Sequence, residues 1–220
     1  MKASLLRPPF TATHADCPYM SGFSFFTFVT GFGDQGVILP FAAAVAIALA
    51  ASGARHEAMI WCGAISVALA GTLVAKIFFL PCGHLIPVLD IRSPSGHTAA
   101  AIAAYGGFAV LWARLSHHNL MRIGFISAAL AAGFAIAASR VAIGAHTTPE
   151  VLLGGLIGIS APAILAGIEP PAGEPRPRPT LLLLLIPLAL VLLLHGAALP
   201  VEGIIDGFSM RLMALLGICV

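Results

Sequence analysis

Long apolar stretches alternate with short polar connections along most of this chain. A transmembrane helix needs about 20 consecutive apolar residues, and six stretches approach that length. The first two carry no charged side chain before Lys76. The pattern predicts an all-α fold, a polytopic membrane helix bundle of about six transmembrane helices. The predicted spans cover roughly residues 37–51, 58–80, 98–115, 123–138, 151–168 and 181–199.

Three segments outside the spans differ in composition. Aromatic residues crowd into residues 19–32, and because aromatic rings favour the headgroup region, we expect an interfacial helix there. Residues 169–179 are rich in proline and charge and predict an exposed loop. We expect a single membrane-embedded domain over the whole chain. Its parts are an N-terminal interfacial segment (1–34), a six-span bundle (35–199) and an amphipathic tail (200–220).

The composition agrees with a membrane protein. Hydrophobic residues make up 59% of the chain and charged residues 9%, whereas soluble domains carry about 25% charged residues. The mean hydropathy is +1.00. A net charge of +2 without a basic stripe excludes a nucleic-acid partner. The four cysteines show no C-x-x-C spacing, so we expect no metal cluster or redox motif.

Arginine positions bear on the orientation in the membrane, because positive residues favour the cytoplasmic side. The connections after the first, third and fifth predicted spans carry arginine, which predicts that these connections are cytoplasmic. The loops around residues 81–97 and 140–150 then share the opposite, non-cytoplasmic face. The arginines concerned are Arg55, Arg114, Arg122, Arg176 and Arg178.

The run Pro94-Ser95-Gly96-His97 opens the third predicted span. The free N–H groups and positive dipole end of a helix N-terminus bind phosphate, and glycine allows close approach. His97 at that rim could donate a proton to a leaving oxygen. The alternative is that Pro94 and Ser95 only cap a membrane helix.

A second polar cluster follows the fourth predicted span. Arg140 offers a fork for phosphate oxygens, His146 a nucleophile, and Glu150 a carboxylate that could orient the imidazole. Each has a plain alternative: a snorkelling arginine, a loop histidine and an acid that stabilises a helix dipole. One crossing and one return separate His97 from Ser139, so both clusters end on the same face.

These two motifs resemble those of the type 2 phosphatidic acid phosphatase family, which read P-S-G-H and S-R-x5-H-x3-D. The resemblance implies that His146 attacks phosphorus and forms a phosphohistidine, that Glu150 orients it and that His97 protonates the leaving group. It also implies that Arg140, Ser95 and the Gly96 amide hold phosphate oxygens. No cofactor and no metal are needed in that scheme.

This chain departs from the family pattern at two places. Glu150 stands where the family has aspartate. The first family motif, K-x6-R-P, is matched at Lys76, which we assign to phosphate binding, but Gly83 and His84 replace its arginine and proline. We hypothesise that Arg92 supplies the missing charge, with His84 as the weaker candidate.

Three functional hypotheses follow. The first is a membrane phosphatase that acts on a phosphorylated lipid, such as phosphatidic acid, phosphatidylglycerol phosphate or a polyprenyl diphosphate. The second is a catalytically silent lipid-phosphate binding or scaffold protein of the same fold. The third, a transporter, predicts polar or broken helices deep in several spans, and apart from Lys76 and His195 the spans contain few such residues. We expect a bacterial inner (plasma) membrane location, with the site on the non-cytoplasmic face; the sequence leaves the oligomeric state open.

Overall fold

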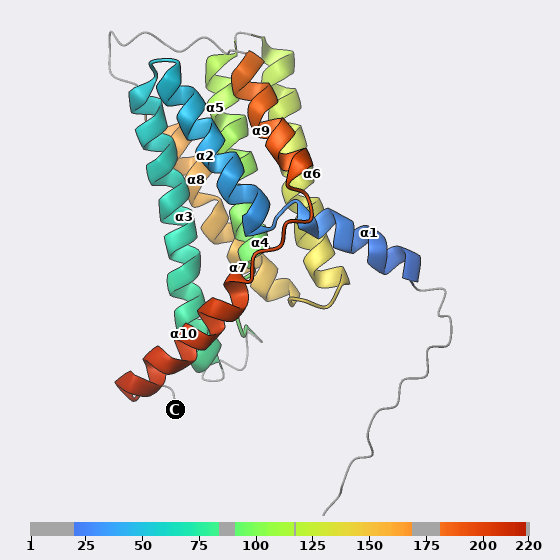
Figure 1. Cartoon of the computed structure of the whole chain (residues 1–220), viewed down its shortest axis with the longest axis vertical. Helices are drawn as coiled ribbons and strands as arrows, with labels where there is room; N and C mark the ends of the chain where they lie inside the picture. Colours follow the sequence, from blue (N-terminus) through green and yellow to red (C-terminus); the bar gives the residue numbers. More distant parts are fainter. Residues whose placement is uncertain (1–19, 84–90, 117, 169–180, 219–220) are drawn as a thin grey trace, which may run out of the picture.

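The described part of the computed structural model, residues 20–83, 91–116, 118–168 and 181–218, consists of helices and connections, without strands (Figure 1). Apolar side chains dominate every long helix, as the hydropathy pattern predicts. The elements are α1 (Met20–Gly31), α2 (Gln35–Ala51), α3 (Arg55–Cys82), α4 (Gly96–Ala101), the π-helix η3 (Ile102–Gly106), α5 (Gly107–Leu115), α6 (Asn119–Ala142), α7 (Thr148–Gly158), α8 (Ser160–Gly167), α9 (Leu181–Leu193) and α10 (Val201–Leu216).

Five of the described helical stretches are long and apolar enough to cross a membrane, which confirms a polytopic helical membrane protein. The first joins the second half of α1 to α2 across a turn at residues 32–34, and Figure 1 shows α1 running sideways from the bundle. The interfacial role of this segment stays a prediction. The five stretches are Phe25–Ala51, Arg55–Cys82, Gly96–Leu115, Asn119–Ala142 and Thr148–Gly167.

The sixth predicted span, residues 181–199, is not confirmed. Helix α9 has 13 residues, which gives a length of about 20 Å, whereas the hydrocarbon core is about 30 Å thick. The helix ends at Leu193, and the chain turns at Gly196, whose φ of 87° belongs to the left-handed region that favours glycine. In Figure 1, α9 accordingly lies beside α2 over only part of the length of the bundle.

Small residues let the helices that carry the polar motifs approach one another closely. A Cβ atom at Gly154 of α7 would lie 2.4 Å from the Ser95 carbonyl oxygen, and one at Gly158 would lie 2.6 Å from that of Ala99. Glycine at both positions therefore allows α7 to pack directly on the start of α4. Elsewhere aliphatic and alanine side chains fill most of the core together with a few aromatic rings, among them Trp61, whose Nε1 donates to the Ala42 carbonyl at 2.9 Å.

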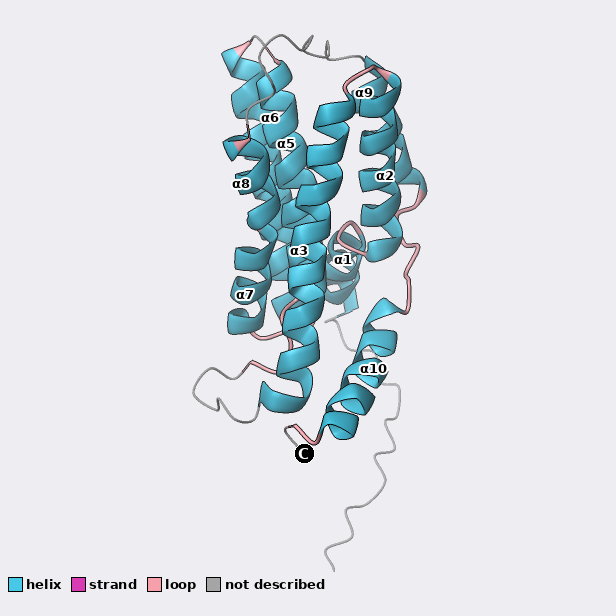
Figure 2. Cartoon of the chain, turned by 90° about the vertical axis from the view of Figure 1, so that its left-hand side faces the viewer, coloured by secondary structure: helices cyan, strands magenta, loops and turns pink. Residues whose placement is uncertain are grey.

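The C-terminal helix α10 packs against the last turns of α3 (Figure 2). Ser209 Oγ donates to the Ile77 carbonyl oxygen of α3 at 2.9 Å. At the other end of the connection from α9, the Leu199 N–H donates to Asp34 Oδ1 at 3.1 Å. These contacts place the first turn of α10 over the end of the bundle where α6 ends and α4 and α7 begin.

Candidate functional site

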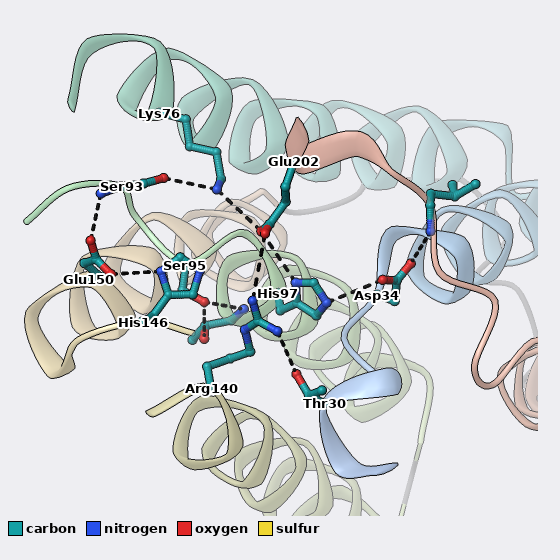
Figure 3. Close-up of polar contacts among 12 residues, drawn as sticks. Thr30, Asp34, Lys76, Ser93, Ser95, His97, Arg140, His146, Glu150 and Glu202 are labelled. Carbon is teal, nitrogen blue, oxygen red and sulfur yellow. Dashed lines mark hydrogen bonds and ion pairs between the residues drawn. The ribbon is translucent and has the colours of Figure 1, made fainter. Parts of the chain in front are cut away.

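Polar side chains from six elements meet at this end of an otherwise apolar bundle (Figure 3). Lys76 comes from the end of α3, His97 from the start of α4 and Arg140 from the end of α6. The site is completed by His146 and Glu150 around the start of α7, Glu202 in the first turn of α10, and Asp34 at the N-cap of α2. Burying so many polar groups is costly unless they are paired, and most of them are.

His146 is held by Glu150. The chain leaves α6 through Gly144, whose φ is 70°, and enters α7 through a capping box formed by Thr147 and Glu150. The Glu150 Oε2 atom lies 2.9 Å from His146 Nδ1 and accepts the Thr147 N–H at 3.0 Å. Because the carboxylate only accepts hydrogen bonds, His146 Nδ1 carries the proton and donates it to Glu150, and the lone pair of the neutral imidazole is at Nε2.

The other ring nitrogen of His146, Nε2, is available to react. It is buried, and it has no hydrogen-bond partner among the described residues. Burial lowers the pKa of His146 below its ordinary value of 6.5, and the Arg140 charge acts in the same direction, although Glu150 opposes both. The ring is therefore neutral at neutral pH, which is the form a nucleophile requires.

Glu150 also holds the loop before α4. Its Oε1 accepts the backbone N–H groups of Arg92 and Ser93, both at 2.8 Å, and its carbonyl oxygen accepts the Ser95 N–H at 3.0 Å. One residue thus fixes His146 on one side and the approach to His97 on the other. A carboxylate with four donors is strongly stabilised in its charged form.

The start of α4 combines a cap with a close approach. Ser95 Oγ accepts the Thr98 hydroxyl at 3.0 Å and the Thr98 N–H at 3.5 Å, so Ser95 is the N-cap of the helix. Gly96 lies against the other polar groups, because a Cβ atom there would be 3.2 Å from Lys76 Cε and 3.5 Å from Glu202 Oε1. Its lack of a side chain keeps the first turn of α4 open to an anion.

Three basic side chains converge on one carboxylate. Glu202 Oε1 lies 3.5 Å from Lys76 Nζ and 3.7 Å from His97 Nδ1, and Glu202 Oε2 lies 3.8 Å from Arg140. We call Lys76, His97 and Arg140 the cation cluster. The interaction with His97, followed by the charges of Lys76 and Arg140, lowers the pKa of Glu202 against the opposing effect of burial. The cluster is therefore an anion site.

The turn between α1 and α2 supports the cation cluster from the other side. Asp34 Oδ2 lies 3.5 Å from His97 Nε2, while Asp34 Oδ1 accepts the Gly36 N–H at 2.8 Å. Thr30 Oγ1 accepts a hydrogen bond from Arg140 at 3.4 Å. The Arg140 Nε atom is buried without a partner among the described residues, so this side chain retains a free donor.

Two residues were proposed as substitutes for the missing first-motif arginine, and of these the structure describes Arg92 alone. Arg92 takes part through its backbone N–H; its side chain is exposed and makes no polar contact with the described residues. His84 lies outside the described residues. A Cβ atom at Gly83 would lie 2.5 Å from the Ile91 carbonyl oxygen, so an arginine there requires the chain at Ile91 to move.

The sequence motifs do not reveal several residues of the site. Glu202 and Asp34 are far from the motifs along the chain, and Ser93, which accepts a hydrogen bond from Lys76 Nζ at 3.2 Å, precedes the second motif. The available signal is weak: Asp34 and Glu202 are isolated acids beside apolar segments. Among the residues that the structure describes, no three His, Cys, Asp or Glu side chains are grouped as metal ligands.

An apolar cavity of about 490 Å³ adjoins the site. Its lining includes Thr98, next to His97, and Val151, next to Glu150, and it continues between α5, α6 and α7 through residues such as Ile126 and Leu156. An apolar cavity of this size next to an anion site matches an amphiphile with a charged head and a hydrocarbon tail.

Comparisons with known proteins agree with the motifs. Residues 78–170 match the PAP2 superfamily. Over 153 residues the chain is 30% identical to an uncharacterized 22.5 kDa protein in the cps region of Klebsiella pneumoniae, a match that covers 67% of this chain and 70% of that protein. No solved structure matches the chain. The superfamily match includes His97, Arg140, His146 and Glu150, while Glu202 lies beyond it.

Proposed function

Because this chain belongs to the PAP2 superfamily of type 2 phosphatidic acid phosphatases, we propose that it is a membrane phosphatase acting on a lipid phosphate. Members of the superfamily are generally metal-independent phosphatases. The observation that carries the proposal is the pairing of an oriented, unpartnered His146 Nε2 with three basic side chains that already hold an anion.

The first chemical step transfers the phosphoryl group to His146. The Nε2 lone pair attacks phosphorus, the bond from phosphorus to the lipid oxygen breaks, and His97 gives its proton to that oxygen. Lys76, Arg140 and the Gly96 N–H hold the phosphoryl oxygens as charge develops on them, with the Ser95 hydroxyl beside them. The dephosphorylated lipid then leaves.

The second step regenerates the enzyme. Water attacks the phosphohistidine, His97 accepts a proton from that water, and the bond between phosphorus and Nε2 breaks to release inorganic phosphate. Glu150 keeps the Nδ1 proton in place through both steps, so that Nε2 is the reactive nitrogen throughout.

The substrate we propose is a phosphomonoester or diphosphate of a lipid, such as phosphatidic acid, phosphatidylglycerol phosphate or a polyprenyl diphosphate. Its headgroup binds at the cation cluster, and its chain occupies the apolar cavity between α5, α6 and α7. We further propose that the protein lies in a bacterial inner (plasma) membrane with the site on the non-cytoplasmic face. Arg55, Arg114 and Arg122 lie at the opposite ends of the helices that carry the site, as the positive-inside rule requires.

The test is phosphate release by the purified protein in detergent from a panel of these lipids. We expect release from at least one of them and its loss in His146→Ala. Ser160→Ala is the control, because Ser160 Oγ donates only to the Ile157 carbonyl within its own helical region. Release that survives in His146→Ala contradicts the proposal.

A second candidate is a catalytically silent lipid-phosphate binding protein. It is favoured by Gly83, where the family has an arginine and where the nearby Ile91 carbonyl leaves no room for one. This candidate predicts that lipid phosphates bind and protect the protein from thermal unfolding without any release of phosphate. Release that depends on His146 rules it out.

A further inference from the structure

Glu202 occupies the position in which the cation cluster would hold a phosphoryl group. Its carboxylate lies between Lys76, His97 and Arg140, at 3.5, 3.7 and 3.8 Å. It also lies beside Gly96, where a Cβ atom would come within 3.5 Å of Glu202 Oε1. A carboxylate and a phosphoryl group both present oxygen acceptors to such donors, so the two compete for the same groups.

The position of Glu202 does not depend on these ion pairs alone. The connection that leads into α10 is held by the hydrogen bond from Leu199 to Asp34, and the helix itself is held by the hydrogen bond from Ser209 to Ile77. The contact between Ser209 and Ile77 involves no residue of the cation cluster, whereas the Asp34 carboxylate that accepts from Leu199 also lies 3.5 Å from His97. Glu202 faces the cluster from this docked helix, whereas Asp206, one turn later, is exposed.

An acid in the first turn of a helix also has a plain explanation, because it stabilises the helix dipole. That effect needs no contact with other elements. It leaves unexplained why basic side chains from three separate helices reach this one carboxylate. Stabilisation of the helix end is therefore an insufficient account of Glu202.

The carboxylate is placed so that it can leave. The Glu202 side chain is 41% exposed, and each of its ion pairs is longer than 3.4 Å. The three partners are largely buried, with exposed fractions of 4% for Lys76, 14% for His97 and 10% for Arg140. Because the attraction between charges falls with distance and is screened on the side open to solvent, these pairs hold the carboxylate less firmly than close contacts would. A dianionic phosphate gains more from the same three partners than a single carboxylate does, so substrate can displace it.

We propose that Glu202 is the resting occupant of the phosphate site and that the substrate must displace it to bind. The proposal rests on the function proposed above, because it takes the cation cluster as the place where phosphate binds. The C-terminal helix then competes with substrate and with inorganic phosphate alike, and it sets the affinity of the site for both.

The test compares full-length Glu202→Gln with Asp206→Asn, which makes the same chemical change one turn away on the exposed face. If the carboxylate occupies the site nine-tenths of the time, its removal lowers both the KM for lipid phosphate and the inhibition constant for inorganic phosphate about tenfold. Both constants fall by the same factor, kcat does not fall, and Asp206→Asn leaves all three unchanged.

A second variant leaves residue 202 unchanged, so its effect cannot come from the new glutamine side chain. Ser209→Ala removes the anchor of α10 on Ile77 and leaves every charge of the site in place. We expect it to lower the same two constants in the same direction, by a smaller factor, because α10 then leaves the site more often.

Two readouts separate this proposal from the proposed function. Binding of inorganic phosphate, measured by titration calorimetry, needs no turnover. If Glu202→Gln binds phosphate more tightly but no lipid is hydrolysed, the proposal that Glu202 occupies the phosphate site is supported and the proposed phosphatase function is contradicted. If Glu202→Gln hydrolyses lipid but its inhibition constant for inorganic phosphate is unchanged or raised, the proposal for Glu202 is wrong and the proposed phosphatase function is still supported. A fall in kcat without a fall in KM also overturns the proposal for Glu202, since Glu202 then assists catalysis.

Discussion

Replacing Glu150 by glutamine tests whether one carboxylate organises the whole site. Both Glu150 oxygens act only as acceptors, and together they accept from Arg92, Ser93, Thr147 and His146. The amide group of glutamine offers one oxygen and one NH₂. Whichever way it is turned, it therefore faces two donors with a donor and loses two of the four hydrogen bonds.

The expected magnitudes follow from those contacts. A hydrogen bond to a charged group contributes about 1.5–3 kcal/mol, so the loss of two lowers the free energy of unfolding by about 3 kcal/mol or more. If the NH₂ faces His146, the ring shifts its proton to Nε2 and the nucleophile is lost. The comparable change in a serine hydrolase triad lowers kcat roughly 10⁴-fold, and we expect a similar fall.

Aspartate at this position is a sharper probe, because it is the residue that the family motif contains. It shortens the side chain by one carbon–carbon bond, about 1.5 Å. Its carboxylate cannot reach the Arg92 and Ser93 amides and His146 together, so we expect Glu150→Asp to lose about 100-fold in kcat. The spacing of this site, unlike that of the family motif, requires glutamate.

The assay is phosphate release in detergent under saturating lipid, with thermal unfolding followed in parallel. Glu57→Gln is the matched control, because Glu57 is also a buried first-turn glutamate, near Arg114 of α5 and away from the site. It should leave kcat unchanged even if it lowers stability. A Glu150→Gln variant that keeps kcat within tenfold of the parent refutes this account of Glu150.

Three further predictions concern single residues. The lowered pKa of His146 keeps the ring unprotonated to below pH 6.5, so kcat/KM should fall on the acid side only below that value; a fall that begins above it contradicts the assignment. Gly154→Ala places a methyl group against the Ser95 backbone and should cost about 1–3 kcal/mol in thermal unfolding, whereas Gly167→Ala, with open space around it, should not. Arg92→Ala keeps the backbone N–H that binds Glu150 and should change KM less than about threefold, whereas Arg140→Ala should abolish turnover. A large rise in KM for Arg92→Ala would instead support the hypothesis that Arg92 replaces the charge of the missing first-motif arginine.

The sequence allowed the main part of the bundle to be predicted because apolar length is a direct requirement of a membrane span. Five spans follow the predicted stretches. Four of them begin and end within a few residues of the prediction, whereas the first begins at Phe25 rather than at residue 37, because it includes the second half of α1. The sixth fails because Leu194 to Leu199 is apolar on average yet contains the Gly196 turn, which hydropathy does not detect. The π-helix η3 is equally invisible to a hydropathy pattern.

The site divides in a similar way. His97, Arg140, His146 and Glu150 were predicted because they belong to two sequence motifs, and one crossing and one return between the motifs bring both to the same face. Glu202 was not, because its role depends on where α10 docks. That docking rests on packing against α3 and on hydrogen bonds from Leu199 to Asp34 and from Ser209 to Ile77, not on any local pattern.

The covalent intermediate on His146 is the most direct test of the central claim. The purified protein is mixed with a lipid substrate labelled in its terminal phosphate, quenched within one turnover and digested, and the labelled peptide is identified. We expect label on His146 that is lost in acid and kept in base, as is typical of a phosphohistidine, and no label in His146→Ala. Phosphate release from His146→Ala, or label on another residue, contradicts the central claim.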